Sequence, residues 1–333
     1  MTLDYALRRI GFFFLVVWIT ITVMFFLVHL APGDPITDQV TRMQASGQSL
    51  PAGPELIQKY QEQFGLDEPV YEQYVDYVVQ LAQGNLGYSV TNFPTKVTTL
   101  IGDALPWTLG LLLTAMIISW VVGSLLGGLM AWRSTPALAR GLMSTVMLFA
   151  AIPYYLVALF LLYVFAYKLQ WLPTGGSRDP LGTSGGAFGS VVDVIEHGLL
   201  PALSIVLAFV GFWMLGMRSM MVSVLGSDYL QLAEAKGLPE RRIFLRYGMR
   251  NAILPQVTSL AIYMGYMVAG SILVEVLFSY PGLGKVLVSA VDSRDYPVIE
   301  GVVLMMVVAT AGALLIIDLI YPLIDPRIRY GRD

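Results

Sequence analysis

The chain of 333 residues has no cysteine and only two histidines, His29 and His197. The absence of cysteine excludes disulfides, thiolate catalysis and cysteine-ligated metals, and two histidines make a histidine-based metal site improbable, so we expect no bound metal. Charged residues make up only 13% of the chain, apolar residues make up 56%, and the mean hydropathy is +0.68. This balance is typical of a membrane protein and not of a soluble domain.

Motifs for nucleotide binding and for intramembrane catalysis are also absent. The nearest candidate for a phosphate loop, Gly284-Lys285, has Ser279 where the first glycine is needed and Val286 where the hydroxyl is needed. His-Glu-x-x-His, Gly-x-Ser-x-Gly and potassium-filter sequences do not occur. We therefore expect a chain that is not an enzyme, has no catalytic residues, and binds neither a cofactor nor nucleic acid itself.

Six apolar runs indicate membrane-spanning helices. The first, residues 10–31, has no charged side chain, and about 22 residues at 1.5 Å per residue span a hydrocarbon core of roughly 30 Å. It is longer than the apolar core of a signal peptide, so we interpret it as an uncleaved anchor with His29 at its outer end. The other predicted spans are 105–132, 142–167, 199–217, 252–278 and 298–320. The predicted fold class is an all-α membrane protein with six transmembrane helices.

Proline and glycine within these runs have a packing interpretation. Pro153 lies inside the third predicted span, where neighbouring helices can satisfy the freed backbone groups. Gly123, Gly127 and Gly128 give the second span a small-residue face that allows close helix approach. The glycine-rich stretch 175–189 follows no strand and precedes no lysine, so we expect a flexible loop and not a phosphate site.

A polar segment, residues 32–103, separates the first two spans. It has a Gly/Ser/Pro-rich patch at 46–54 and a helical pattern at 55–82. Its nine carboxylates and three basic residues favour the outer side of the membrane. The expected organisation has three parts: 1–31 with the first helix, 32–103 as an external insert, and 104–333 as a five-helix core.

Basic residues predict the orientation of the chain in the membrane. When the segments between spans are assigned to alternate sides, thirteen of the 20 basic residues fall on one side, which is therefore the cytoplasmic side. These are Arg8, Arg9, Arg133, Arg140, Arg218, Lys236, Arg241, Arg242, Arg246, Arg250, Arg327, Arg329 and Arg332. Both termini and the polar hairpin formed by residues 218–251 are then cytoplasmic.

Local signals in the polar hairpin predict two helices. Asp228, with Gln231 three residues on, is a capping-box-like start, and Gly237 followed by Pro239 is a helix stop, so residues 229–236 should form a helix of about two turns. A second helix begins near Pro239. Its arginines recur every four residues and form a basic stripe: Arg242, Arg246 and Arg250.

The polar hairpin resembles the cytoplasmic coupling loop of binding-protein-dependent ABC importer permeases, and more narrowly that of the dipeptide/oligopeptide-type permeases. The similar runs are Ala-Glu-Ala-Lys-Gly-Leu-Pro-Glu-Arg-Arg at 233–242 and Arg-Asn-Ala-Ile-Leu-Pro at 250–255. Gln231, Leu232 and Ala233 occupy the positions of the family's Glu-Ala-Ala, and the glutamine departs from it. Gly237 matches the family's glycine.

The same family accounts for motifs over most of the chain. The motifs are Phe-Gly-Leu-Asp-Glu-Pro-Val-Tyr-Glu-Gln-Tyr (64–74), Gly-Asn-Leu-Gly-Tyr-Ser (84–89), Tyr-Pro-Gly-Leu-Gly (280–284), Arg-Asp-Tyr-Pro (294–297) and Asp-Pro-Arg (325–327). The resemblance implies a type I ABC importer permease core whose coupling helix docks into a cleft on an ATPase subunit. The implied coupling residues are Asp228, Gln231, Ala233, Glu234, Ala235, Lys236, Gly237, Arg241 and Arg242.

The resemblance also implies partners, location and substrate. The partners are a second homologous permease, two ATP-binding subunits that hold ATP and Mg, and a substrate-binding protein, in a bacterial or archaeal inner membrane. ATP hydrolysis on the partner subunits would move the polar hairpin as a lever. Peptides are the default substrate of this branch. Ala-Glu-Ala-Lys-Gly (233–237), 104–109 and 278–282 also resemble oligosaccharide-carrying relatives, so both substrate classes stay open.

Ionisable and flexible side chains within the spans are candidates for the substrate pathway. Glu275 lies near the outer end of the fifth span, where it either reaches water or faces the pathway and meets a substrate amine or hydroxyl. Asp318, near the inner end of the sixth, is expected to pair with a cytoplasmic arginine. Flexible methionines suit a permissive pathway, although helix packing explains them equally well: Met214, Met217, Met220, Met221, Met264 and Met267.

A function of another class remains open, namely a secondary carrier driven by protons through Glu275 and Asp318. Carriers usually show inverted repeats and more polar residues near the membrane midplane, and this sequence shows neither. Dependence of uptake on ATP or on the proton gradient distinguishes the two functions.

Overall fold

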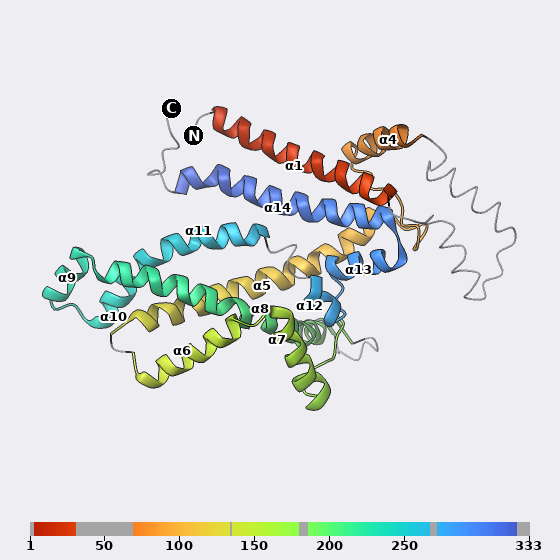
Figure 1. Ribbon diagram of the computed structural model, residues 1–333. Coiled ribbons are helices and arrows are strands. Elements are labelled where there is room, and N and C mark those ends of the chain that lie inside the picture. The colour runs from red at the N-terminus through yellow and green to blue at the C-terminus, as the bar shows by residue number, and fades with distance from the viewer. Residues whose placement is uncertain (1–2, 31–68, 134, 180–185, 267–271, 325–333) are drawn as a thin grey trace. The chain divides into compact units, whose positions relative to one another are not determined.

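The computed structural model describes residues 3–30, 69–133, 135–179, 186–266 and 272–324 (Figure 1). These residues are mainly helical, and the only extended pairing among the described residues is an isolated bridge between Tyr88 and Lys96. The chain divides into two compact units. One unit is Met1–Trp107 with Gly282–Leu319, and the other is Thr108–Pro281 with Ile320–Asp333. The expected all-α membrane class fits this structure.

The first unit contains two long apolar helices that lie side by side (Figure 1). Within it, Arg9 forms an ion pair with Asp318 at 3.1 Å, and the Tyr5 hydroxyl donates to the Asp318 backbone carbonyl. The expectation that Asp318 pairs with an arginine is confirmed. The helices of this unit are α1 (Leu3–Leu30), α4 (Val70–Ala82), the start of α5 (Val97–Ala131), α13 (Leu283–Ser293) and most of α14 (Tyr296–Ile324).

The second unit is a bundle around the long helix α8 (Gly186–Leu225). Before α8 come the rest of α5, α6 (Ala137–Ala150), α7 (Tyr154–Leu161) and the π-helix η1 (Leu162–Lys168). After α8 come α9 (Asp228–Ala235), α10 (Glu240–Arg242), the π-helix η2 (Ile243–Met249), α11 (Arg250–Tyr266) and α12 (Ile272–Leu277).

Glycines of α5 allow α8 to approach closely. A Cβ atom on Gly123 would lie 2.6 Å from the Val210 carbonyl oxygen, and one on Gly127 would overlap the backbone carbonyl of Met214. A methyl group cannot fit against fixed backbone at such separations. The prediction of a small-residue packing face on the second span is therefore confirmed for these two positions.

The predicted third span, 142–167, is not a single straight helix. The axes of 143–150 and 154–168 differ by 108°, and the break falls at Pro153, which precedes the first residue of α7. Proline has no N–H to continue the helix, and its ring disfavours helical geometry in the preceding residue. In this chain neighbouring helices do not hold the run straight.

The predicted number of six spans is not fully tested by the structure. Four of the described helices are long and apolar enough to cross a membrane, or five if the bent pair counts as one span. The predicted fifth span covers α11 and α12, with residues 267–271 between them outside the described part. The count of six, and the division into 1–31, 32–103 and 104–333, stay predictions.

Several helix boundaries differ from the expected ones. α5 begins at Val97 and α8 begins at Gly186, each well before the predicted apolar run. The last residues of the expected loop 175–189 are therefore helical. The predicted helical pattern 55–82 is present as α4 from Val70, and its first part lies outside the described residues. Apolar runs locate the part of a helix that meets lipid, whereas helices continue into polar surroundings.

Candidate functional site

The polar hairpin begins at the junction of α8 and α9. The predicted helix 229–236 is observed at Asp228–Ala235, but Ser227 and not Asp228 is its first flanking residue. The Ser227 hydroxyl donates to the Val224 carbonyl oxygen at 2.6 Å and does not cap α9. The capping box expected of Asp228 and Gln231 is therefore wrong. Asp228 instead lies in the first turn, where its charge favours the helix dipole.

Gly237 ends α9 in the left-handed conformation, with φ of +69°. Its N–H donates to the Glu234 carbonyl oxygen at 2.9 Å, and the Leu238 N–H donates to the Ala233 carbonyl oxygen at 3.3 Å. These two bonds make a Schellman motif, for which glycine is the preferred residue because it has no Cβ. The helix stop predicted at Gly237 is confirmed.

A small apolar core folds the polar hairpin back on itself. Leu230, Ala233 and Ile243 are 1%, 3% and 3% exposed, and Leu238 and Tyr247 pack against them. Ala233 was expected among the residues that touch an ATPase. Ala233 is instead buried inside the hairpin. It follows Leu230 by three residues, about one helical turn, so both side chains lie on the inward face of α9.

The outward face of α9 combines polar residues with two uncovered apolar side chains. Leu232 is 56% exposed and Tyr229 is 40% exposed. The two side chains are three residues apart and therefore lie on the same side of the helix. Sequence reasoning noted Leu232 only as a motif position. Leu232 follows Leu230 by two residues and so lies on the opposite side of the helix, and this was the signal that it faces outward. The exposed coupling residues are Asp228, Gln231, Glu234, Ala235, Lys236, Gly237, Arg241 and Arg242.

The predicted basic stripe is exposed along its whole length, at Arg242, Arg246 and Arg250. It does not follow a regular α-helix, because η2 between the first and last arginine is π-helical. Arg133, which follows the end of α5, approaches Glu234 of α9 at 3.9 Å, with side chains 75% and 41% exposed. Ion pairs with such exposure contribute little to stability. The three arginines of the stripe are exposed and therefore accessible to a partner.

Two of the predicted pathway methionines lie at a helix contact. Met214 and Met217 are fully buried where α8 meets Gly127 of α5, so helix packing accounts for both. Met264 is partly buried on α11, and Met267 lies outside the described residues. The structure therefore brings Met214 and Met217 together but gives no evidence that they line an opening.

Glu275 is completely buried in α12. Within this chain its side chain reaches neither water nor an open pathway, so both interpretations stay predictions. Its backbone carbonyl accepts the Tyr280 N–H at 2.8 Å. Burial, and then the charge of Glu275, raise the pKa of Tyr280, so that phenol stays neutral. Among the described residues, no cluster of three His, Asp or Glu side chains could hold a metal ion.

A buried polar contact formed by residues 89–91 around Asp295 was missed by sequence reasoning; we name it the external clasp because residues 89–91 belong to the predicted external insert. The Asp295 carboxylate, 2% exposed, accepts hydrogen bonds from the Ser89 hydroxyl and from the N–H groups of Val90 (3.1 Å) and Thr91 (3.0 Å). It joins the 84–89 and 294–297 motifs, each of which had been recognised separately. Three donors on one carboxylate satisfy the buried charge.

A second buried carboxylate, Glu300 on α14, was also missed. It is 8% exposed and hydrogen-bonded to Tyr77 of α4. Burial, followed by the charge and hydrogen bond of Glu300, raises the pKa of Tyr77. The signal was available, because Glu300 lies inside the predicted run 298–320, where any carboxylate is costly.

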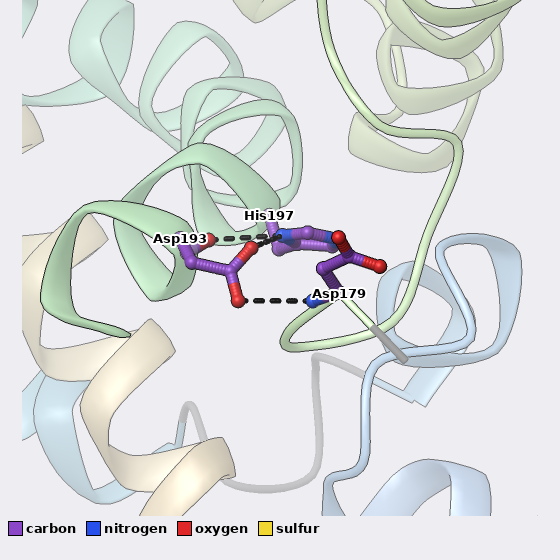
Figure 2. A network of polar contacts seen from close by, with 3 residues as sticks. All are labelled: Asp179, Asp193 and His197. Atoms are coloured by element: carbon purple, nitrogen blue, oxygen red, sulfur yellow. Dashed lines mark hydrogen bonds and ion pairs between the residues drawn. The ribbon is translucent and has the colours of Figure 1, made fainter. Parts of the chain in front are cut away.

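A third polar network ties the loop after η1 to α8 (Figure 2). Asp193 Oδ1 lies 3.0 Å from His197 Nδ1, and Asp193 Oδ2 accepts the Asp179 N–H at 2.9 Å. The Gly176 N–H donates to the Phe278 carbonyl oxygen at 2.8 Å, which fixes the same loop to the end of α12. These bonds hold residues 176–179 in place, and we see in them a structural role.

Comparison with known proteins covers nearly the whole chain. Residues 123–330 match the family described as binding-protein-dependent transport system inner membrane component, and residues 2–112 match the N-terminal family of the same membrane components. A putative peptide permease protein of Brucella suis is 35% identical over 306 residues, 92% of each chain.

Two further relatives have more specific names. An oligopeptide transport system permease protein of Bacillus subtilis is 35% identical over 315 residues, covering 93% of this chain and 94% of the relative. A glutathione transport system permease protein of Escherichia coli is 32% identical over 333 residues, covering 98% and 99%. Similarity of this extent, together with the membrane helices and the exposed polar hairpin, shows that the chain belongs to the family of binding-protein-dependent transport system inner membrane components.

Proposed function

We propose that this chain is the permease subunit of an ATP-driven importer that takes up peptides delivered by a binding protein. The observation that carries the proposal is similarity over more than nine-tenths of the chain to permeases whose names refer to peptides, oligopeptides and glutathione. Glutathione is itself a small peptide, so the three names agree on one substrate class. They favour peptides over oligosaccharides.

The polar hairpin is the proposed site of coupling to the ATP-binding subunits. Its Schellman turn and buried Leu230–Ala233–Ile243 core make α9 a rigid unit, and its outer face presents Leu232 and Tyr229 uncovered. A rigid helix with an uncovered apolar anchor can transmit a displacement of a partner without melting. ATP and Mg are held by the partner subunits, and a second permease and a binding protein complete the assembly.

The proposed orientation has both termini and the polar hairpin in the cytoplasm. The excess of basic residues on that side supports it. Reporter fusions after Gly47 and Gly185 are expected to be active on the outer side, and fusions after Gly237 on the cytoplasmic side. A cytoplasmic signal from the Gly47 fusion would overturn both the topology and the coupling site.

Uptake measurements test the energy source and the substrate together. In cells or right-side-out vesicles that hold ATP, uptake of a labelled peptide should survive an uncoupler and stop when ATP is depleted. Unlabelled peptides should compete, and oligosaccharides should not. Uptake that collapses with an uncoupler while ATP stays high would contradict the proposal and favour a proton-driven carrier through Glu275 and Asp318.

A further inference from the structure

Helix α4 has one apolar stripe that no described residue covers. At 3.6 residues per turn, its side chains form three lengthwise stripes. Tyr74, Tyr77 and Leu81 face inward, and Tyr74 and Tyr77 pack on Phe25 of α1, with ring centroids 5.3 and 5.5 Å apart. The next stripe is apolar and exposed: Tyr71 is 68% exposed, Val75 55% and Val79 48%. The third stripe is polar and exposed: Glu72, Asp76 and Gln80.

The level along α1 at which α4 makes contact indicates whether this exposed stripe faces lipid or water. The Tyr74 hydroxyl and the Thr22 hydroxyl share a hydrogen bond of 2.8 Å. Thr22 lies eight residues before Leu30, the last residue of α1, which is about 12 Å along the helix axis. The middle of α4 therefore lies beside the apolar part of α1 and not beyond its end (Figure 1).

The surface of α1 at this level is also apolar and exposed. Phe26 is 45% exposed and stacks on Tyr74 with ring centroids 5.9 Å apart, and Leu27 is 57% exposed. α1 is almost unburied within the chain and is one of its membrane-span candidates. Tyr71 suits a boundary position, because its ring is apolar and its hydroxyl donates to the Glu72 carboxylate at 2.7 Å on the polar side.

We infer that α4 is an interfacial helix that lies in the membrane surface, with Tyr71, Val75 and Val79 in contact with lipid acyl chains and with Glu72, Asp76 and Gln80 in water. Amphipathic helices of this kind bury their apolar face by about 5–10 Å, and the Thr22 contact, about 12 Å from the end of α1, is of the same order. The lipid surface would thus hold α4 at a fixed depth in the membrane surface.

Single cysteines test this placement without background, because the chain has no cysteine of its own. Nitroxide labels at Val75→Cys and Val79→Cys are compared with labels at Asp76→Cys and Gln80→Cys in the full chain, reconstituted with its partner subunits in lipid bilayers. All four positions are exposed, so the labels do not disturb the core. Molecular oxygen concentrates in lipid, whereas a neutral nickel chelate stays in water.

The expected result is that the preference for oxygen over the nickel chelate reverses between adjacent positions. Labels at 75 and 79 should relax more with oxygen than with the nickel chelate, and labels at 76 and 80 should do the reverse. Greater access of the nickel chelate at 75 and 79 would overturn the inference by placing the stripe in water. Poor access of both reagents there would overturn it by showing a protein cover, from another subunit or from residues 31–68. Quenching of a bimane label at 79 by brominated lipid gives an independent second readout.

Discussion

The polar hairpin and the external clasp are stabilised by opposite means. The polar hairpin has an apolar core of three side chains that are close in sequence, and it keeps its charges on the surface. The external clasp has a buried carboxylate whose donor Ser89 lies 206 residues away in sequence. A local apolar core needs only approximate geometry, whereas a buried charge needs every donor in place.

The two regions should therefore fail differently when they are mutated. The polar hairpin should tolerate changes on its outer face and lose only the contact with a partner. The external clasp should lose its structure when the Asp295 carboxylate is removed, because buried hydrogen-bond donors that lose their acceptor reduce the free energy of unfolding. The following substitutions test this contrast, from the largest expected effect to the smallest.

Ala233→Asp is expected to have the largest effect, because it inserts an unpaired carboxylate beside Leu230 and Ile243. Leaving a charge buried without a partner costs about 3–5 kcal/mol, so the hairpin core should open. Amide hydrogen exchange across α9 should then rise strongly. Leu232→Asp, one residue earlier on the exposed face, is the matched control and should leave exchange unchanged. Equal exchange in the two variants would mean that Ala233 is not buried.

Asp295→Ala should destabilise the external clasp by about 3 kcal/mol, because three donors lose a charged acceptor. Residues 89–92 should become accessible to protease, and thermal unfolding of the detergent-solubilised chain should begin at a lower temperature. The exposed Asp292→Ala, three residues earlier near the end of α13, is the control. A clasp that tolerates Asp295→Ala as well as Asp292→Ala would remove the contrast with the polar hairpin.

Gly237→Val should cost about 1–2 kcal/mol, since a β-branched residue is strained at a positive φ. The strain is a backbone effect, because no described atom lies within 4 Å of an added Cβ. Hydrogen exchange at Leu238 should increase while membrane insertion stays normal. Gly237→Asn, which tolerates the left-handed region, should be much milder. If both variants behaved like wild type, Gly237 would not need its observed conformation.

Two local features, the helix stop at Gly237 and the glycine face of α5, were predicted correctly from sequence, whereas the capping box at Asp228 was not. The helix stop at Gly237 follows from the residues around it, and the glycine face of α5 follows from spacing on one helix. The sequence alone could not show whether the helix breaks at Pro153, because a proline within a span is either accommodated by neighbouring helices or ends the helix. Which outcome holds depends on packing that the sequence does not display.

The site residues were predicted less completely, for two physical reasons. The α9 helix was predicted, but its rotation was not, so Ala233 was expected outside and Leu232 was not recognised as the exposed anchor. The external clasp joins Ser89 to Asp295 across most of the chain, and no local rule pairs them. Glu300 was different, because its place in an apolar run was visible and simply overlooked.

Glu234→Gln is expected to have the smallest effect, below about 0.5 kcal/mol, because its ion pair with Arg133 is exposed. A double-mutant cycle with Arg133→Ala, measured by thermal unfolding at low and high salt, should give a coupling energy near zero at high salt. A large, salt-independent coupling would contradict this expectation by showing that the pair holds α9 against the end of α5.

Cross-linking from Leu232 tests the central claim, that the outer face of the polar hairpin contacts an ATP-binding subunit. Leu232→Cys, with no other cysteine in the chain, would be treated with a short thiol–amine cross-linker in the assembled, transport-competent complex. Gln83→Cys at the end of α4 is the control of comparable exposure. We predict a cross-linked product with an ATP-binding subunit from position 232 and none from position 83. A transport-competent complex in which position 232 gives no such product would contradict the claim.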